Sequence, residues 1–151
     1  MVERTILLVE DNPNDEALAL RALKKCGVSH RVIVVRDGRE CLDYLFCEGS
    51  HQDRRESEVP CVVLLDLNLP KIGGLDVLRA VRADPRTNLL PVVILTSSSE
   101  DRDLLAGYQF GTNSYVVKPV DFTHFSDTLG QVADYWLKLN RYPSAVGTAK
   151  A

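Results

Sequence analysis

Short hydrophobic runs alternate with longer amphipathic stretches along the chain. The runs have about the usual length of a strand and lie at residues 5–10, 31–36, 61–66, 91–96 and 114–118. The stretches predict helices near residues 15–26, 39–47, 75–83, 100–110 and 122–140, where Gly27 suits the end of the first and Ser99 or Asp121 could cap later ones. Five alternations of strand and helix predict parallel strands joined by right-handed crossovers.

Three of the runs are continuously apolar, at residues 6–9, 62–65 and 92–95. Strands of this kind are buried on both faces, unlike the alternating strands of a sheet with one wet face. We therefore predict an α/β fold, a doubly wound five-stranded parallel sheet with helices on both faces. In such open sheets, ligands bind beyond the carboxyl ends of the strands, where the strand order reverses.

Composition narrows the class of protein. The 151 residues, 45% of them hydrophobic, suit one domain, and 18 Lys and Arg against 21 Asp and Glu give a net charge of −3. Without a basic run, direct nucleic-acid contact is not expected. No apolar run approaches the ~20 residues of a membrane span, and no signal peptide is recognisable, so we expect a cytoplasmic protein. The cysteines, at positions 26, 41, 47 and 61, form no C-x-x-C pair and are expected to be reduced.

Two segments exceed what five strand–helix units need. Residues 48–59 are highly charged and predict a long loop, and residues 144–151 predict a flexible tail. The predicted domain therefore spans residues 1–143, with an insertion loop at 48–59 and an extended last helix at 121–140.

Polar residues stand at the carboxyl ends of four of the predicted strands: Glu10 and Asp11, Asp66, Thr96, and Lys118. With the first and third strands as neighbours, the three carboxylates would repel one another unless a cation lay between them. Oxygen ligands favour a hard divalent ion, Mg²⁺ or Mn²⁺, with open positions for a phosphoryl group.

A carboxylate beside such an ion can attack phosphorus and form an acyl phosphate, and Asp66 is the candidate nucleophile. Lys118 and backbone N–H groups would stabilise charge on the phosphoryl oxygens, and Thr96 could donate a hydrogen bond to the product. Each residue alone also fits a simpler interpretation, Asp66 as a turn acid and Glu10 with its neighbours as a helix cap. Their joint occurrence at the correct strand ends favours the interpretation as a site that accepts a phosphoryl group.

The residues at these strand ends resemble those of the receiver domains of two-component response regulators. The similarity covers residues 4 to about 128 and rests on four motifs: Leu-Leu-Val-Glu-Asp-Asn at 7–12, Leu-Leu-Asp-Leu-Asn-Leu-Pro at 64–70 with Gly-Gly at 73–74, Val-Ile-Leu-Thr-Ser at 93–97, and Tyr-Val-Val-Lys-Pro at 115–119. It implies a flavodoxin-like strand order, 2-1-3-4-5, and a phosphoacceptor switch rather than a turnover enzyme.

The resemblance also implies roles for individual residues. Asp66 would accept a phosphoryl group from the histidine of a sensor kinase. Asp11, Asp66 and the backbone carbonyl of Asn68 would bind Mg²⁺ directly, and Glu10 would help through water.

Two further residues take part in the implied response. Thr96 would move to bond the phosphate while Tyr115 turned inward, so that the two side chains form a coupled switch. The resemblance also implies that the bond between Lys118 and Pro119 is cis.

A narrower likeness, to the single-domain regulators paired with cyanobacterial phytochromes, rests on the charged insertion at 48–59 and on the segment 135–143. It implies a phytochrome-type histidine kinase as phosphodonor. The insertion, outside the strand–helix framework, is predicted to help select that kinase. A solvated loop without such a role is the alternative.

The last predicted helix carries a stripe with spacings of three and four: Phe122, Phe125, Leu129, Val132, Trp136 and Leu139. The stripe could simply cover the sheet. A helix from 121 to 140 would, however, be ~30 Å long against ~17–20 Å for a strand, so its end would overhang with Tyr135, Trp136 and Leu139. We therefore predict a homodimer through this helix.

Two other functions compete. A Mg²⁺-dependent aspartate-nucleophile phosphatase of the haloacid-dehalogenase type would need a second acid two residues after Asp66, where the chain has Asn68. A flavin or nucleotide binder would need small residues after the first strand, where Glu10 and Asp11 would repel a phosphate.

Overall fold

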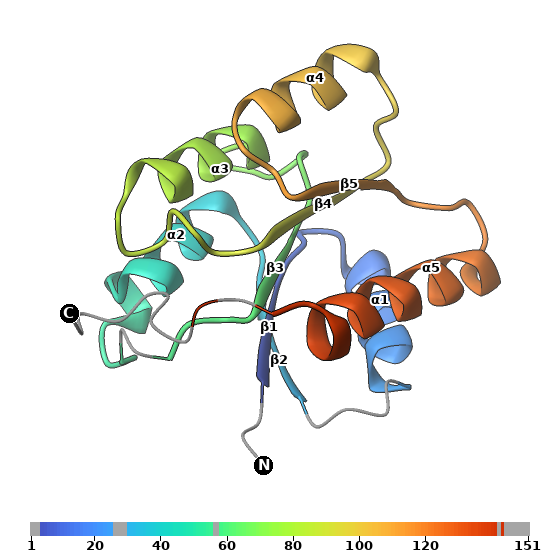
Figure 1. The fold of residues 1–151 in the computed structure, drawn as a ribbon, viewed down its shortest axis with the longest axis horizontal. Coiled ribbons are helices and arrows are strands. Elements are labelled where there is room, and N and C mark those ends of the chain that lie inside the picture. Colours follow the sequence, from blue (N-terminus) through green and yellow to red (C-terminus); the bar gives the residue numbers. More distant parts are fainter. Residues whose placement is uncertain (1–3, 26–29, 56–57, 142, 144–151) are drawn as a thin grey trace.

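The computed structural model of the protein describes residues 4–25, 30–55, 58–141 and 143. Its centre is a sheet of five parallel strands in the order β2-β1-β3-β4-β5 (Figure 1). The strands are β1 (Arg4–Val9), β2 (His30–Val35), β3 (Val62–Leu65), β4 (Val92–Thr96) and β5 (Ser114–Val117). The predicted fold class and strand order are confirmed.

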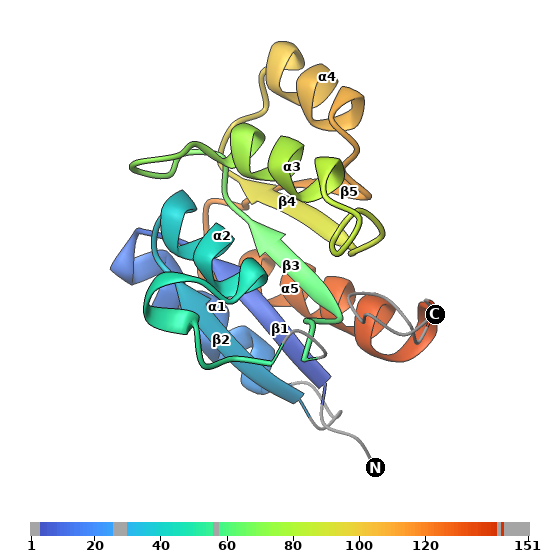
Figure 2. The ribbon, with the colours of Figure 1, turned by 90° about the vertical axis from the view of Figure 1, so that its left-hand side faces the viewer.

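Helices cover both faces of the sheet. They are α1 (Pro13–Lys24), α2 (Gly38–Phe46), α3 (Gly74–Ala83), α4 (Asp101–Gln109) and α5 (Phe122–Asp134), with a 3₁₀ turn η1 (Gly49–His51) and a π-helical turn η2 (Tyr135–Leu139). Figures 1 and 2 show α2, α3 and α4 on one face and α1 with α5 on the other. Each of the five predicted helices is present, within two residues of its expected start.

The central strands supply both halves of the core. Successive residues of β1, such as Leu7 and Leu8, enter the hydrophobic clusters on opposite faces of the sheet, because successive side chains of a strand point to opposite faces. All of β3 and β4 is buried, as the continuous apolar runs predicted. Full burial of these strands leaves their carboxyl ends as the place where polar side chains can gather.

Side chains fix where several helices begin. Asp121 caps α5 by accepting a hydrogen bond from the backbone N–H of His124 at 2.9 Å, as predicted. Ser99 does not cap α4, because the helix begins after Glu100, whose side chain makes no capping bond. The serine that contacts α4 is Ser98, whose hydroxyl donates to Asp103 at 2.6 Å. Gly27 lies outside the described residues.

The single helix predicted over 121–140 is wrong in its last turn. The α-helix ends at Asp134, and residues 135–139 form a wider π turn. Leu137, beyond the α-helix, is 1% exposed, whereas Leu139 of the predicted stripe is 70% exposed. Phe125 and Leu129 are buried in the core, so this part of the stripe covers the sheet instead of meeting a partner.

The insertion after α2 is anchored to that helix. The guanidinium of Arg54 lies over the ring of Tyr44, 4.3 Å from its centroid, and donates to the carbonyls of Tyr44 and Leu45. These carbonyls belong to the last turn of α2, where the regular helical hydrogen bonds end, and that of Tyr44 also accepts the backbone N–H of Cys47 at 3.4 Å. The segment therefore begins as an ordered cap on α2, whereas residues 56–57 lie outside the described part.

Other expectations concern single residues and the ends of the chain. Cys41 and Cys61 are buried and Cys47 is half-buried, all as free thiols, whereas Cys26 lies outside the described residues, as does the predicted tail at 144–151. In the described part of the chain, no helix is both long enough and apolar enough to span a membrane.

Candidate functional site

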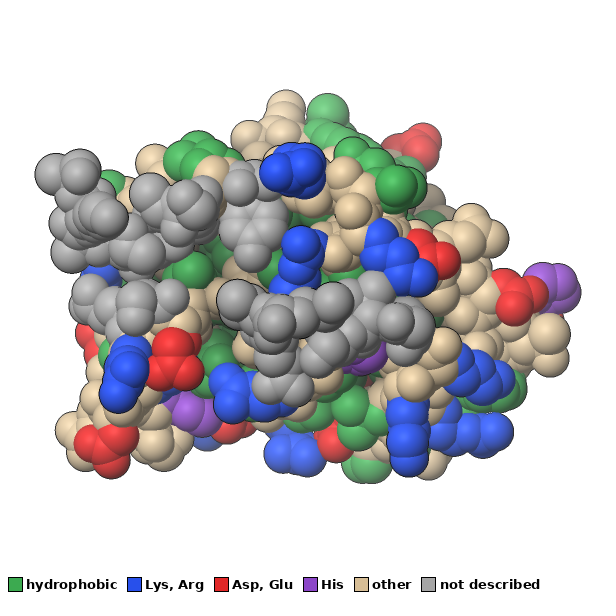
Figure 3. All heavy atoms as spheres, turned by 60° about the horizontal axis from the view of Figure 1, so that its bottom comes forward, with side chains coloured by type: hydrophobic (Ala, Val, Ile, Leu, Met, Phe, Trp, Pro, Cys, Tyr) green, Lys and Arg blue, Asp and Glu red, His purple; other side chains and the backbone are tan. Residues whose placement is uncertain are grey.

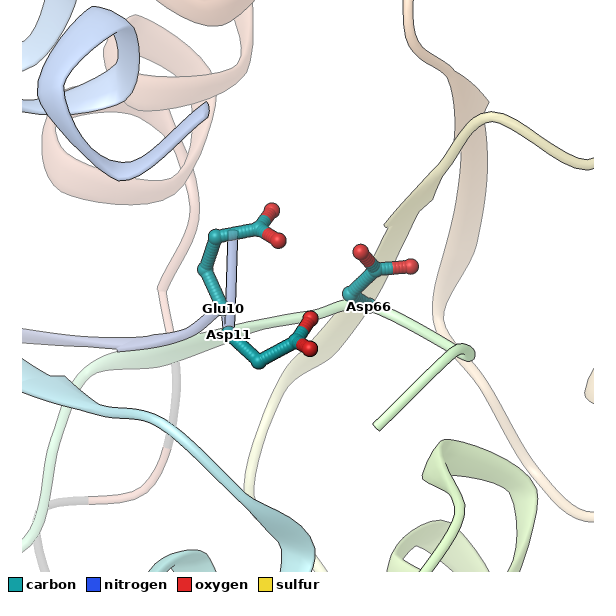
Figure 4. A group of neighbouring side chains, drawn as sticks. All are labelled: Glu10, Asp11 and Asp66. Carbon is teal, nitrogen blue, oxygen red and sulfur yellow. The ribbon is translucent and has the colours of Figure 1, made fainter. Parts of the chain in front are cut away.

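The acidic side chains meet where β1 and β3 end. These strands are hydrogen-bonded neighbours with Val9 opposite Leu65, so the residues that follow them are brought side by side. One carboxylate oxygen from each of Glu10, Asp11 and Asp66 lies within 4.8 Å of the other two. Figure 4 shows the three side chains around a common space beyond the strand ends.

Burial differs among these three acids. Glu10 and Asp66 are buried, whereas Asp11 is exposed to solvent. Backbone N–H groups donate to the two buried carboxylates, from Asn12 to Glu10 Oε2 at 3.2 Å and from Asn68 to Asp66 Oδ1 at 3.3 Å. Solvent therefore reaches the site from the side of Asp11, whereas Glu10 and Asp66 are shielded from it.

Lys118 reaches this group from the end of β5. Its ammonium, with the side chain 8% exposed, lies 2.6 Å from Glu10 Oε1, 3.0 Å from Asp66 Oδ2 and 3.0 Å from Asp15 Oδ2. An ammonium has three N–H donors, and three carboxylates accept them here. Its own backbone N–H donates to the carbonyl of Thr96 at 2.8 Å, which fixes the end of β5 against β4.

The electrostatics of the cluster follow from burial and from this ammonium. Burial raises the pKa of Glu10 to about 7, although the hydrogen bond from Lys118 works in the opposite direction. Burial alone would lower the pKa of Lys118, but its bond to Glu10 and the charge of Asp66 outweigh that effect and raise it. Lys118 is therefore a permanent positive charge in this site at neutral pH.

Thr96 and Tyr115 are connected through Ser98. Thr96 is fully buried at the end of β4, and its hydroxyl oxygen accepts the backbone N–H of Ser98 at 3.4 Å. The hydroxyl of Tyr115 donates to the carbonyl of the same serine at 2.9 Å. The side chain of Tyr115 also packs against α4 at Gly107, where an added Cβ would lie 3.3 Å from its ring.

One expectation about the backbone is wrong. No peptide bond among the described residues is cis, so Lys118 and Pro119 are joined in trans. The trans form is the lower-energy isomer for bonds that precede proline.

The donor set suits a hard divalent cation. Glu10, Asp11 and Asp66 offer only oxygen, and no other group of three potential ligands this close was found in the described residues. Asn68, which was expected to contribute its backbone carbonyl, follows Asp66 by two residues and is exposed. Asp15 was missed, because an acid in the first turn of a helix is common without any function.

The parallel sheet thus brings a cluster of acids and one lysine together at the point where its strand order reverses. A comparison with family models matches residues 6–129 to the response regulator receiver domain. The chain belongs to this family, whose members act as phosphoacceptor switches with histidine kinases as partners.

Known proteins support this assignment over nearly their full length. The probable methanogenesis regulatory protein FilR2 of Methanothrix harundinacea is 41% identical over 138 residues, covering 91% of this chain and 86% of that protein. The structure of the phosphorylated cyanobacterial phytochrome response regulator RcpA matches with a TM-score of 0.88 and 34% identity, covering 94% and 99% of the two chains. The Mn²⁺-bound structure of response regulator Rcp1, a protein of Synechocystis sp., matches with a TM-score of 0.86 and 32% identity, covering 93% and 99%.

Proposed function

We propose that Asp66 is the phosphoacceptor of this receiver domain and that its phosphorylation changes the binding of a downstream protein. The observation that carries the proposal is the position of Asp66 Oδ2, 3.0 Å from the Lys118 ammonium and within reach of Glu10 and Asp11. A buried nucleophile beside a fixed positive charge is suited to attack a phosphoryl group, whose negative charge would otherwise repel a carboxylate.

In the proposed step, a carboxylate oxygen of Asp66 forms a bond to phosphorus while the phosphorus–nitrogen bond of a kinase phosphohistidine breaks. The electron pair of that bond returns to the imidazole nitrogen, which takes up a proton. Lys118 stabilises negative charge on the phosphoryl oxygens during the transfer. The product is an acyl phosphate on Asp66.

Asp11, Asp66 and the backbone carbonyl of Asn68 would hold Mg²⁺ or Mn²⁺, with Glu10 acting through water. The ion would offset the charge of the carboxylates and of the phosphoryl oxygens. The oxygen-only donor set supports this assignment, as does the Mn²⁺-bound form of Rcp1.

Thr96 and Tyr115 would carry the response. Thr96 would donate its hydroxyl to the phosphate, and Tyr115 would change its orientation as the segment around Ser98 adjusts. The hydrogen bonds from Ser98 N–H to Thr96 and from Tyr115 to the Ser98 carbonyl support this link. In this proposal the protein is a switch rather than a turnover enzyme.

The phosphatase alternative is not favoured. Its mechanism needs a second acid two residues after the nucleophile to protonate the leaving group. That position holds Asn68, whose amide cannot act as a general acid. A stable label on Asp66, instead of turnover of small phosphate esters, is therefore the expected behaviour.

The phosphodonor would be a phytochrome-type histidine kinase. RcpA, a phytochrome response regulator, is similar to this chain over 94% of this chain's length. We propose that the insertion at 48–59 helps to select the kinase, and direct transfer of a phosphoryl group from purified kinases tests the donor.

A homodimer is also proposed, with its surface revised by the structure. Phe125 is buried and can take no part, whereas Tyr135 and Leu139 are 47% and 70% exposed at the end of the last helix. Trp136 packs edge-on against Tyr135, with ring centroids 4.9 Å apart, and Phe122 is half-buried at the other end of α5. Figure 3 shows one face of the molecule, on which hydrophobic side chains form small areas between basic and acidic ones.

The phosphoacceptor assignment is tested by Asp66→Asn. This variant should lose labelling by a small acyl phosphate and by the kinase, because an amide is not a nucleophile toward phosphorus, and a chelator should abolish labelling of the parent. Glu16→Gln, which removes a carboxylate of α1 that pairs with Arg36 instead, is the matched control and should label normally. Normal labelling of the Asp66→Asn variant would overturn the assignment.

A further inference from the structure

We propose that Asp15 is a positioning residue that holds the Lys118 ammonium in place during phosphorylation of Asp66. This inference rests on the proposed function. Asp15 Oδ2 lies 3.0 Å from Lys118 Nζ, the same distance as Asp66 Oδ2. Asp15 is not one of the three clustered acids that would hold a cation.

The three partners of Lys118 come from different parts of the fold. Glu10 follows β1 and Asp66 follows β3, but Asp15 stands in the first turn of α1. Asp15 thus connects the end of β5, which carries Lys118, to the start of α1. Its side chain is 37% exposed, so it lies at the rim of the site.

Local structure fixes the place of Asp15. The side chain of Asn12 accepts the backbone N–H groups of Asn14 and Asp15, at 2.9 and 3.1 Å, and Pro13 occupies the first helical position. This cap defines the start of α1 and with it the direction of the Asp15 side chain. The contact with Lys118 therefore requires no further ordering of the backbone around Asp15.

The need for such a residue arises when the site is loaded. A divalent cation would neutralise charge on Glu10 and Asp66, and a phosphoryl group would use an oxygen of Asp66. Both events weaken the attraction that holds Lys118, and the cation repels its ammonium directly. Asp15 keeps its full charge and its hydrogen bond, so it retains the ammonium beside the phosphoryl oxygens.

A purely structural role for Asp15 would be a counter-charge for a nearly buried lysine. Its removal would then reduce the stability of the fold without affecting phosphorylation through Lys118. The two roles differ in whether the effect of Asp15 on the labelling rate depends on the presence of Lys118.

The test measures the rate of labelling by a small acyl phosphate at saturating Mg²⁺ in four proteins: the parent, Asp15→Ala, Lys118→Ala and the double variant. Asp15→Ala should slow labelling roughly three- to tenfold, in the lower part of the range of couplings between contacting residues, and should have no further effect once Lys118 is absent. Glu16→Ala removes the same charge one residue away, from an acid paired with Arg36, and should label like the parent.

A second measurement follows the Lys118 ammonium by NMR with and without Mg²⁺. It does not depend on phosphorylation of Asp66. The parent and Glu16→Ala should keep a hydrogen-bonded ammonium signal when Mg²⁺ is added, and Asp15→Ala should lose it. Asp15→Asn, with an uncharged acceptor, should be intermediate and serves if the alanine variant does not fold.

Parental labelling in Asp15→Ala, or equal slowing with and without Lys118, would overturn the inference. So would an ammonium signal that persists in Asp15→Ala with Mg²⁺. Failure of the parent to be labelled on Asp66 would instead refute the proposed function, and the NMR result would still decide whether Asp15 positions Lys118.

Discussion

At the scale of single residues, the charge balance around Lys118 accounts for the properties of the site. When Glu10, Asp11, Asp15 and Asp66 are all ionised, four carboxylates face one ammonium, an excess of three negative charges. A divalent cation removes most of this excess, which gives a physical reason for Mg²⁺ dependence. Burial is the main reason why the pKa of Glu10 lies near 7, and the charge of Asp66 adds to the rise despite the bond to Lys118.

Thr96→Ala should leave Asp66 open to phosphorylation but separate phosphorylation from the response. The phosphate would form without its hydroxyl donor, so binding of the downstream protein should become nearly independent of phosphorylation. Binding assays with phosphorylated and unphosphorylated protein measure this, and Thr96→Ser, which keeps the hydroxyl, should retain most of the response. Parental target binding by phosphorylated Thr96→Ala would show that Thr96 is not part of the switch.

The sequence predicts residues whose place follows from strand order. The positions of Asp66 and Lys118 in one site could be predicted, because the ends of parallel strands must meet at one edge of the sheet. Asp15 could not, because its contact depends on the exact start of α1 and on the reach of a lysine more than 100 positions away. Ser98 was missed for a similar reason, since its backbone groups rather than its side chain link Thr96 to Tyr115.

At the scale of elements, the end of α5 shows where a periodic pattern fails. Apolar spacing of three and four predicts one regular helix to residue 140, but a π turn begins at Tyr135. The buried face continues to Leu137, whereas the predicted stripe ends at Leu139, which is exposed. The pattern was therefore sufficient for the core residues Phe125 and Leu129 and insufficient for the residues beyond Asp134.

Leu137 and Leu139 provide a matched test of this turn. Leu137→Ala should lower the free energy of unfolding by about 2–4 kcal/mol, because it leaves a cavity against the sheet. Leu139→Ala, at an exposed position, should change it by less than about 0.5 kcal/mol. Urea denaturation of both variants measures the difference, and the reverse order would mean that Leu139, not Leu137, packs in the core.

The insertion after α2 is the other element with a proposed role. A shortened loop that keeps Arg54 and its bonds to α2 should be labelled normally by a small acyl phosphate but more slowly by the kinase. Arg54→Ala removes the anchor but keeps the loop length. It therefore separates the effect of an ordered loop on phosphotransfer from the effect of the loop being present. If both donors labelled the shortened protein equally slowly, damage to the fold would explain the result and kinase selection would be refuted.

At the scale of the whole molecule, the order β2-β1-β3-β4-β5 determines where function can lie. The order reverses between β1 and β3, and the acids that follow these strands form the site there. The alternation of strands and helices was enough to predict this arrangement, because crossover handedness and parallel pairing leave few alternatives. Self-association could not be predicted at the same level, since it depends on which side chains a single turn exposes.

Sedimentation at micromolar concentration tests the proposed homodimer. Tyr135→Asp and Leu139→Asp should shift the parent from dimer to monomer, because each places a charge on exposed apolar surface at the end of the last helix. Leu105→Asp, at an exposed position on α4, is the control and should leave the dimer intact. A parent that remains monomeric with and without phosphorylation would refute the dimer.

The most direct measurement locates the phosphoryl group itself. The protein is labelled with a small acyl phosphate in the presence of Mg²⁺ and reduced with borohydride, which converts an aspartyl phosphate to homoserine, and its peptides are then sequenced by mass spectrometry. The account predicts homoserine at position 66, in a Mg²⁺-dependent amount, with Asp11 and Asp15 unchanged. Homoserine at position 11 or 15, or a parent that is labelled without conversion at position 66, would contradict it.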